Sequence, residues 1–255
     1  MNNNQYNSNY DRHIDNVESG LVESVSQSSP LITEADRYKF VTKVYSIVCL
    51  QLIVTSVMCA CAVSNYMHVR DYFISKDGQN LLILSIIGMI STSLCTICCC
   101  ANLLKVQPGN YVILSVFTLC TSYIVSYSCL AYKPIVILQA LLITITIVVC
   151  LVIYAITTKS DVTTQSSALL YAGMGFIVMT IMGMFFHSSL FEMLISFCGA
   201  ALFSVYIVYD IQMIVGGKRN QFNTDDYVLA SIMLYLDIVN LFLEILRILN
   251  GPNNE

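Results

Sequence analysis

Charged side chains are scarce in this sequence. Only 11% of the 255 residues are Asp, Glu, Lys or Arg, whereas 56% are hydrophobic, and the mean hydropathy is +0.71. In soluble globular proteins roughly a quarter of the residues carry a charge. The composition therefore predicts an integral membrane protein, whose main solvent is lipid.

Three other absences narrow the possibilities. The net charge is −4 and the 12 basic residues are scattered, so no basic stripe is available to follow a nucleic-acid backbone. The first forty residues lack the early apolar run of a signal peptide, and we expect insertion to depend on the first membrane helix. No Asn-x-Ser/Thr site for N-glycosylation occurs. The 11 Cys residues lie mostly in apolar runs, where Cys behaves as a small hydrophobe.

Long apolar runs are what the sequence has instead. A helix needs about 20 residues to cross a hydrocarbon core of about 30 Å. Seven runs are long enough, and they cover 44–64, 81–101, 111–131, 134–156, 168–187, 190–215 and 227–249.

The short loops between these runs predict how the helices are arranged. Consecutive helices joined by a few residues must run antiparallel as neighbours. We therefore expect an all-α polytopic membrane protein, with one bundle of seven transmembrane helices in residues 37–255. The segment 1–36 is polar, rich in Asn and Ser and poor in aromatic residues, so it is predicted to be a disordered tail.

Lys and Arg in the loops predict the orientation in the membrane, because cytosolic loops carry an excess of them. A cytosolic N-terminus places eight basic residues inside and three outside. The inside set is Arg12, Arg37, Lys39, Lys43, Lys105, Lys159, Lys218 and Arg219, and the outside set is Arg70, Lys76 and Lys133. We expect a cytosolic N-terminus. Seven spans then put the C-terminus on the other side, unless the last segment re-enters the membrane instead of crossing it.

Four carboxylates fall within the last two apolar runs. Glu192 opens the sixth run, Asp210 lies toward its far end, and Asp237 and Glu244 lie in the seventh. An ionisable group inside a membrane helix costs about 2.5 to 3.5 kcal/mol on insertion scales, so each of these is a candidate functional residue.

Asp210 and Asp237 are predicted to meet. The loop 216–226 joins the two helices into an antiparallel hairpin, and a rise of ~1.5 Å per residue puts Asp210 about 9 Å and Asp237 about 15 Å from the same membrane face. Two carboxylates in one site of low dielectric constant tend to share a proton. Such a pair suits pH sensing, cation binding or acid catalysis.

The seventh helix also carries a polar stripe. Asp237, Asn240 and Glu244 recur at i, i+3 and i+7 and so share one face, which predicts that they line a cavity. Glu244 and Arg247 are spaced to form an ion pair. The alternative interpretation is that these groups are structural and only hold helices together through polar contacts.

Several separated motifs resemble the transmembrane Bax inhibitor motif family, and its lifeguard branch most closely. The strongest are FSVYIVYDIQMIVGG at 203–217 and DDYVLASIMLYLDIVNLFLEILRIL at 225–249. The segments RYKFVTKVYSIVCLQLIVT at 37–55, PGNYVILSVFT at 108–118 and YAITTKSD at 154–161 also match, in the same order. The resemblance covers about 37–249.

This resemblance implies a seven-helix bundle with the seventh helix at its centre. It also implies a pH-sensitive calcium leak pathway in the endoplasmic reticulum or Golgi, and in animals suppression of cell death. The paired aspartates of the family map onto Asp210 and Asp237, where calcium would bind transiently. Its acidic residue for ion passage falls on Glu192, and Asp225 and Asp226 occupy an acidic loop beside the pathway. It implies neither an enzyme nor a resident cofactor.

Two departures from the family pattern bear on the gate. The run 81–101 contains no charged residue, so the Arg that prokaryotic relatives place against one aspartate is missing. Glu244 adds a negative group where relatives have an aromatic or apolar residue.

Two other functions remain as alternatives. One is an adaptor that binds cell-death regulators or other calcium channels, with the tail as its binding segment. The other is an intramembrane aspartyl protease, which Tyr209 and Asp210 fit. The residues before Asp237 do not fit it, because a Gly-x-Gly run is absent there.

Overall fold

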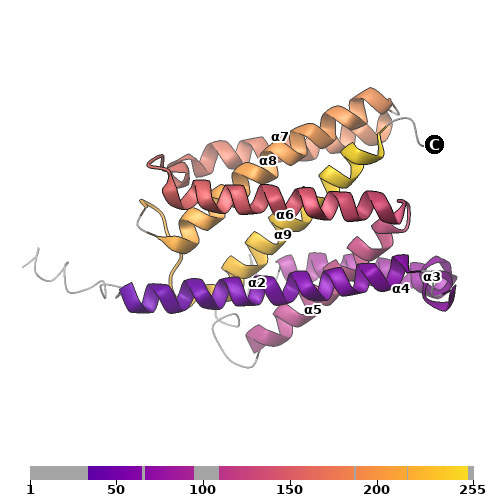
Figure 1. Cartoon of the computed structure of the whole chain (residues 1–255), viewed down its shortest axis with the longest axis horizontal. Coiled ribbons are helices and arrows are strands. Elements are labelled where there is room, and N and C mark those ends of the chain that lie inside the picture. Colours follow the sequence, from indigo (N-terminus) through magenta and orange to yellow (C-terminus); the bar gives the residue numbers. More distant parts are fainter. Residues whose placement is uncertain (1–33, 65–66, 95–108, 187, 217, 252–255) are drawn as a thin grey trace, which may run out of the picture. The chain divides into compact units, whose positions relative to one another are not determined.

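A computed structural model describes residues 34–64, 67–94, 109–186, 188–216 and 218–251. These residues form helices joined by short connections, and no strand occurs among them (Figure 1). The helices are α2 (Glu34–Val63), α3 (Met67–Ile74), α4 (Lys76–Leu94), α5 (Gly109–Cys129), α6 (Pro134–Thr157), η3 (Val162–Gln165), α7 (Ser166–Phe185), α8 (Ser189–Val215) and α9 (Tyr227–Asn250).

The described part of the chain contains six helices long and apolar enough to span a membrane. They are α2, α5, α6, α8, α9 and the continuous segment Val162–Phe185, which joins η3 to α7. The protein is therefore an all-helical polytopic membrane protein. The predicted run 81–101 is described only as far as Leu94, in α4, and the rest of it lies outside the described residues. A seventh span stays a prediction.

One boundary differs from the sequence-based expectation. Helix α2 begins at Glu34, so the end of the segment 1–36 predicted to be disordered is helical; the rest of that segment, 1–33, lies outside the described residues. Glu34 and Asp36 lie in the first turn of α2, where negative side chains stabilise the helix dipole. Contacts divide the chain into two units, Met1–Arg37 and Tyr38–Glu255, and the second unit holds the long helices from α4 to α9 and most of α2.

Helix α3 was not predicted, because its eight residues are too few and too polar for a membrane run. It is held by Phe73, whose ring stacks on Tyr123 of α5 with centroids 4.7 Å apart. The hydroxyl of Tyr123 donates to the carbonyl oxygen of Gly78 in α4 at 3.0 Å. The aromatic pair thus fixes α3 to α5, and the hydrogen bond joins α5 to α4 beside it.

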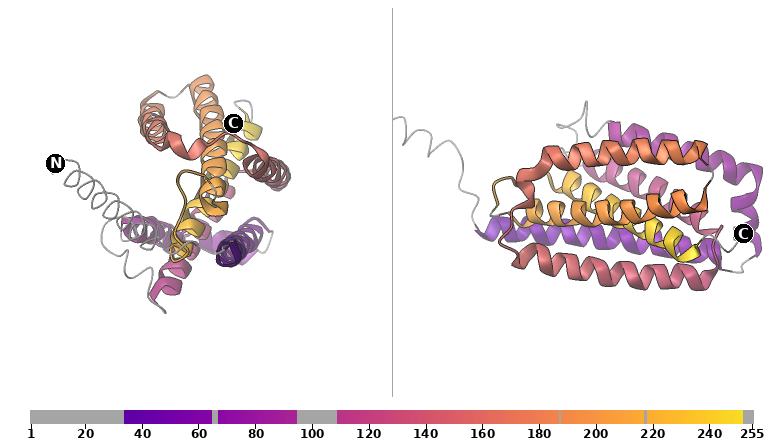
Figure 2. Two further views of the ribbon diagram at one scale, coloured as in Figure 1. Left: turned by 90° about the vertical axis from the view of Figure 1, so that its left-hand side faces the viewer. Right: turned by 90° about the horizontal axis from the view of Figure 1, so that it is seen from above.

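Successive long helices run in opposite directions (Figures 1 and 2). We call the end of the unit that holds the α6–α7 and α8–α9 loops the near side. The far side is the end that holds the α5–α6 and α7–α8 connections. These two names are used for the ends of the membrane-spanning helices below.

Helix α9 is the most buried of the six candidate spans. Of its most apolar window, 56% is buried, against 11% for α6 and none for Val162–Phe185. It runs obliquely to the other helices and packs against α5, α6 and α8 (Figures 1 and 2). The apolar side chains of α6 and α7 that remain exposed are suited to contact with lipid, whereas α9 is largely shielded by protein.

Polar contacts connect α2 to the other helices. The amide of Gln51 donates to Thr118 of α5 at 2.9 Å. The hydroxyl of Thr55 lies 2.8 Å from those of both Ser122 in α5 and Tyr235 in α9. Because lipid removes most of the hydrophobic drive for helix association, buried hydrogen bonds of this kind contribute to holding membrane helices together.

Candidate functional site

The structure brings Asp210 and Asp237 together. Asp210 lies about 8 Å before the near-side end of α8, and Asp237 lies about 15 Å inside α9, counted at ~1.5 Å per residue. Because the two helices form a hairpin, the two carboxyl groups come within hydrogen-bonding reach of each other. Asp210 is only 2% exposed and Asp237 is partly buried.

The surroundings of this pair offer little compensation for two negative charges. Among the described residues, the buried Oδ2 atom of Asp210 has no hydrogen-bond donor, and no Lys or Arg contributes to the electrostatics of either carboxyl group. Two tyrosines interact electrostatically with the pair, Tyr209 with Asp210 and Tyr206 with Asp237. Two carboxyl groups can form a hydrogen bond with each other only when one of them carries a proton.

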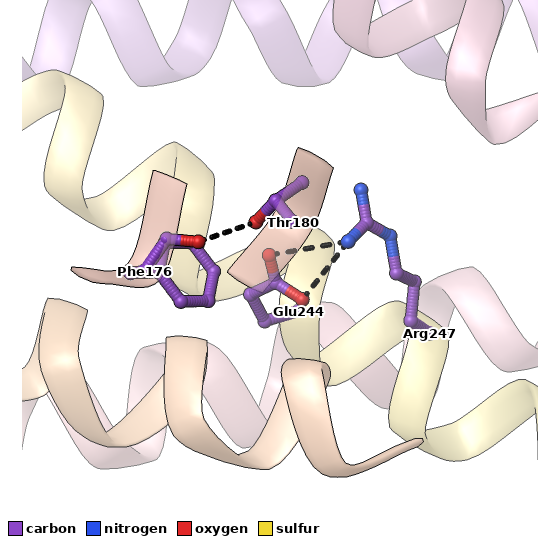
Figure 3. Close-up of polar contacts among 4 residues, drawn as sticks. All are labelled: Phe176, Thr180, Glu244 and Arg247. Atoms are coloured by element: carbon purple, nitrogen blue, oxygen red, sulfur yellow. Dashed lines mark hydrogen bonds and ion pairs between the residues drawn. The ribbon is translucent and has the colours of Figure 1, made fainter. Parts of the chain in front are cut away.

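A second acidic group lies about two helical turns further along α9, toward the far side. Glu244 is 6% exposed, and its two oxygens accept hydrogen bonds from Nη1 of Arg247 at 3.3 and 3.2 Å (Figure 3). The hydroxyl of Ser196 in α8 is a further partner of this carboxylate. Glu244 is thus stabilised by a cation, unlike the pair at Asp210 and Asp237.

Close packing surrounds Glu244. A Cβ atom built on Gly199 of α8 would lie 3.0 Å from the carboxyl carbon of Glu244 and 2.7 Å from the ring of Phe176. Figure 3 shows Phe176 and Thr180 of α7 beside the Glu244 and Arg247 pair. Glu244 therefore fills a tight junction of α7, α8 and α9, an arrangement that suits a structural contact between helices.

The other predicted site residues do not join the pair at Asp210 and Asp237. Glu192 is exposed in the first turn of α8, on the far side. Asp225 and Asp226 lie in the near-side loop before α9, where Asp226 is the N-cap residue. Asn240 is partly buried on α9, between Asp237 and Glu244. These groups are therefore spread along the length of the α8–α9 hairpin.

A near-side cluster that the sequence analysis missed fastens the α6–α7 loop to α8 and to the loop after it. Gln212 of α8 accepts from the backbone N–H of Val162 at 2.9 Å and donates to the carbonyl oxygen of Ser160 at 3.0 Å. Nζ of Lys218 donates to the carbonyl oxygen of Thr158 at 3.1 Å. Gln212 follows Asp210 by two residues, so the two side chains point to different faces of α8 and the cluster is separate from the carboxyl pair.

Asp161 is the charged member of this cluster. Its carboxylate accepts from the hydroxyl of Thr163 at 2.6 Å and from the backbone N–H groups of Thr163 and Arg219 at 3.0 and 3.2 Å. The hydrogen bond from the Thr163 hydroxyl, followed by the one from the Arg219 backbone, lowers the pKa of Asp161. Two features of the sequence could have predicted this cluster. One is the amide side chain of Gln212 within the apolar run YDIQMIV, and the other is the motif YAITTKSD, which ends at Asp161.

Tyr235 was also missed as a structural residue. It is fully buried on α9, its hydroxyl bonds to Thr55, and its ring packs edge-on against Phe117 at a centroid distance of 6.4 Å. The signal for this contact lies in α2, where the polar residues Gln51 and Thr55 recur at i and i+4 within an apolar run.

The described residues contain no group of three or more His, Cys, Asp or Glu side chains arranged to hold a metal ion. Calcium takes six to eight oxygen ligands. Two carboxyl groups supply only part of such a shell, so an ion at Asp210 and Asp237 would keep water ligands. The arrangement fits brief contact with a passing ion better than permanent binding.

The fold and the site together define the class of this protein. It is a helical polytopic membrane protein whose last hairpin holds a pair of aspartates between its helices. The sequence model of the family described as inhibitor of apoptosis-promoting Bax1 matches residues 37–254. The chain belongs to this Bax inhibitor family, which confirms the resemblance predicted from the motifs.

Individual relatives support the lifeguard branch. Protein lifeguard 4 of Mus musculus is 30% identical over 220 residues, which cover 86% of this chain and 87% of the relative. Protein LIFEGUARD 2 of Arabidopsis thaliana is 29% identical over 231 residues, or 88% and 93% of the two chains. The Golgi anti-apoptotic protein of Vaccinia virus (strain Lister) is 31% identical over 220 residues, or 86% and 88%.

Proposed function

We propose that this chain is a pH-sensitive calcium leak channel of endomembranes, which acts in calcium homeostasis and in the suppression of cell death. The observation that carries the proposal is the contact between the carboxyl groups of Asp210 and Asp237 inside the membrane-spanning hairpin. A charged carboxylate inside a membrane is unfavourable in free energy. Two carboxyl groups in contact can share a proton, so the charge of the site changes with pH.

The gate follows from the chemistry of the pair. With one shared proton, the two groups form a charge-assisted hydrogen bond that joins α8 to α9. Loss of that proton places two negative charges in contact, and a second proton removes the charge that strengthens the bond. The closed state is then most stable when the pair holds one proton, so calcium flux varies with pH. No Arg latch is needed in this scheme.

The remaining acidic residues extend the proposed path. Asp225 and Asp226 would attract cations at the near side and Glu192 at the far side, and Asn240 would line the path between them. Glu244, which Arg247 and Ser196 hold in a tight junction of helices, has a structural role beside the path. We further propose a seven-helix bundle in which α4 continues to a full span and α9 lies at the centre. The N-terminus would be cytosolic, since the near side carries most of the Lys and Arg residues.

Membership in the family and the names of the relatives support the cellular part of the proposal. One relative is called a Golgi anti-apoptotic protein. We accordingly place this chain in the Golgi or endoplasmic reticulum, with calcium and protons as its permeant or regulatory ions.

Reconstitution of the purified chain separates a channel from an adaptor. Liposomes that hold only this protein, loaded with a calcium indicator, should take up calcium faster than protein-free liposomes. An adaptor needs a partner and would give no flux in this assay at any pH. If suppression of cell death survives Asp210→Ala but is lost when residues 1–36 are deleted, the protein acts as an adaptor and the channel proposal is wrong.

The paired carboxyl groups are also the catalytic chemistry of an aspartyl protease. The matched assay incubates the same proteoliposomes with membrane-spanning peptides and analyses them by mass spectrometry. Cleavage that disappears in Asp210→Ala would replace the channel proposal, and intact peptides are the expected result.

A further inference from the structure

A groove of about 860 Å³ opens between α2 and α6, which run alongside one another in Figure 1. Its floor is formed by Ile238, Val239 and Phe242 of α9. The groove begins on the far side at Ser64 and Pro134 and extends along both helices to Cys49 and Val149. The proposed ion path does not use it, since Asp210, Asp237 and Asn240 do not line its walls.

The lining offers little to a polar ligand. Most of the lining side chains are aliphatic, and several of the hydroxyls among them already have partners. Thr144 donates to the carbonyl oxygen of Ala140 at 2.7 Å, and Ser64 donates to that of Cys61 at 2.9 Å. The hydroxyl of Thr55 takes part in the contact with Ser122 and Tyr235. A hydrocarbon chain fits such walls without leaving a buried polar group unpaired.

The length of the groove and the charge at its mouth suit a phospholipid. From Pro134 to Val149 the lining of α6 extends about 22 Å, which accommodates the acyl chain of one leaflet in a hydrocarbon core of about 30 Å. Lys133, the residue before Pro134, is exposed at the far-side mouth and makes no ion pair within the described part of the chain. An ammonium group at this position is placed to attract a lipid phosphate.

We propose that this groove is a binding site for one phospholipid of the far-side leaflet. One acyl chain lies between α2 and α6, and the phosphate lies near Lys133. The lipid fills space that protein side chains leave open and so supports the position of α2. This site does not depend on the proposed channel function, because it requires only that the six candidate helices cross a bilayer.

Photocrosslinking tests the site directly. The full chain is reconstituted with a small fraction of phosphatidylglycerol that carries a diazirine in one acyl chain, and labelled peptides are mapped by mass spectrometry. Labelling should concentrate on the groove-lining parts of α2 and α6, and it should saturate as the probe fraction rises. Even labelling of all exposed apolar residues, in proportion to the probe fraction, would overturn the proposal, because bulk lipid behaves in that way.

Adjacent residues of α6 provide a matched pair of variants. Leu141 lines the groove, whereas Leu142 is 58% exposed and does not line it. Leu141→Trp should reduce groove labelling several-fold, and Leu142→Trp should leave it unchanged; equal effects would contradict the proposal. If Leu141→Trp does not fold, the saturation curve of the unaltered chain still decides the question. A groove that stays unlabelled at every probe fraction, while the outer faces of α6 and α7 are labelled, would also overturn the proposal.

The headgroup contact has its own test. Lys133→Gln should lower the preference for phosphatidylglycerol over phosphatidylcholine roughly fivefold, since one lysine near an anionic surface contributes about 1 kcal/mol. An unchanged preference would remove the attraction between Lys133 and an anionic headgroup from the proposal.

Discussion

The two acidic sites on α9 reduce the cost of burying a carboxylate charge in different ways. Asp237 meets a second carboxyl group, with no Lys or Arg acting on the pair among the described residues. Glu244, about two turns away, is held by Arg247 and Ser196. A buried carboxylate with its own cation keeps its charge and is costly to separate from that cation, whereas two carboxyl groups in contact depend on a proton that can be added or removed. The carboxyl pair at Asp210 and Asp237 is therefore suited to switching, and the ion pair of Glu244 and Arg247 is suited to holding helices together.

The largest effect should come from leaving Glu244 without its cation. Arg247→Gln should destabilise the protein by about 2 to 3 kcal/mol, less than the loss of a fully buried ion pair because the side chain of Arg247 is 48% exposed. Glu244→Gln should cost less than about 1 kcal/mol, since the charge left unpaired is then that of Arg247, whose side chain is 48% exposed. Unfolding in mixed micelles measures both, and equal losses would contradict the assigned asymmetry.

The packing around Glu244 gives the next effect. Gly199→Ala should destabilise the protein by about 1 to 2 kcal/mol, because its Cβ would crowd Glu244 and Phe176. The control is Gly175→Ala in α7, where a Cβ meets no atom within 4 Å. If the two alanine variants unfold alike, Glu244 does not lie in a rigid junction.

The contact that joins α2 to α9 should be weaker. Tyr235→Phe removes one buried hydroxyl from the contact with Thr55 and Ser122 and should cost about 1 kcal/mol. Phe117→Leu, which alters packing on the same ring, separates the loss of the hydroxyl from the loss of aromatic contact. A Tyr235→Phe variant as stable as the unaltered chain would show that this network does not hold α2.

The smallest effect should come from the near-side cluster. The pKa of Asp161 is lowered in the folded state, so its contribution to stability is present above its unfolded pKa of about 3.9 and is lost as pH falls through the lower folded value. Asp161→Asn should therefore increase the rate of backbone hydrogen exchange in residues 158–163 and 218–220, and the ratio of this rate to that of the unaltered chain should be the same at pH 6 and pH 8. A difference between these two pH values would mean that Asp161 itself responds in the physiological range.

Sequence reasoning reached the hairpin of α8 and α9 because helix geometry is regular. Counting along two helices joined by a loop was enough to place Asp210 opposite Asp237, and the i, i+3 spacing was enough to pair Glu244 with Arg247. It did not reach the contacts of Gln212, Tyr235 or Asp161, because each partner lies far away in the sequence and depends on how helices pack. It also missed α3, whose stability comes from one aromatic contact rather than from a periodic pattern.

The dependence of calcium flux on pH tests the central claim most directly. Proteoliposomes with the unaltered chain, measured from pH 5 to pH 8, should show flux that changes with pH, because the proton shared by Asp210 and Asp237 is gained or lost. Asp237→Asn leaves Asp210 as the only titratable group of the pair, so its pH profile should be shifted, and the double variant with both Asp210→Asn and Asp237→Asn should show flux that is nearly independent of pH. Glu244→Gln, as the comparison, should retain the pH dependence. Flux in the double variant that changes with pH as in the unaltered chain would contradict the account.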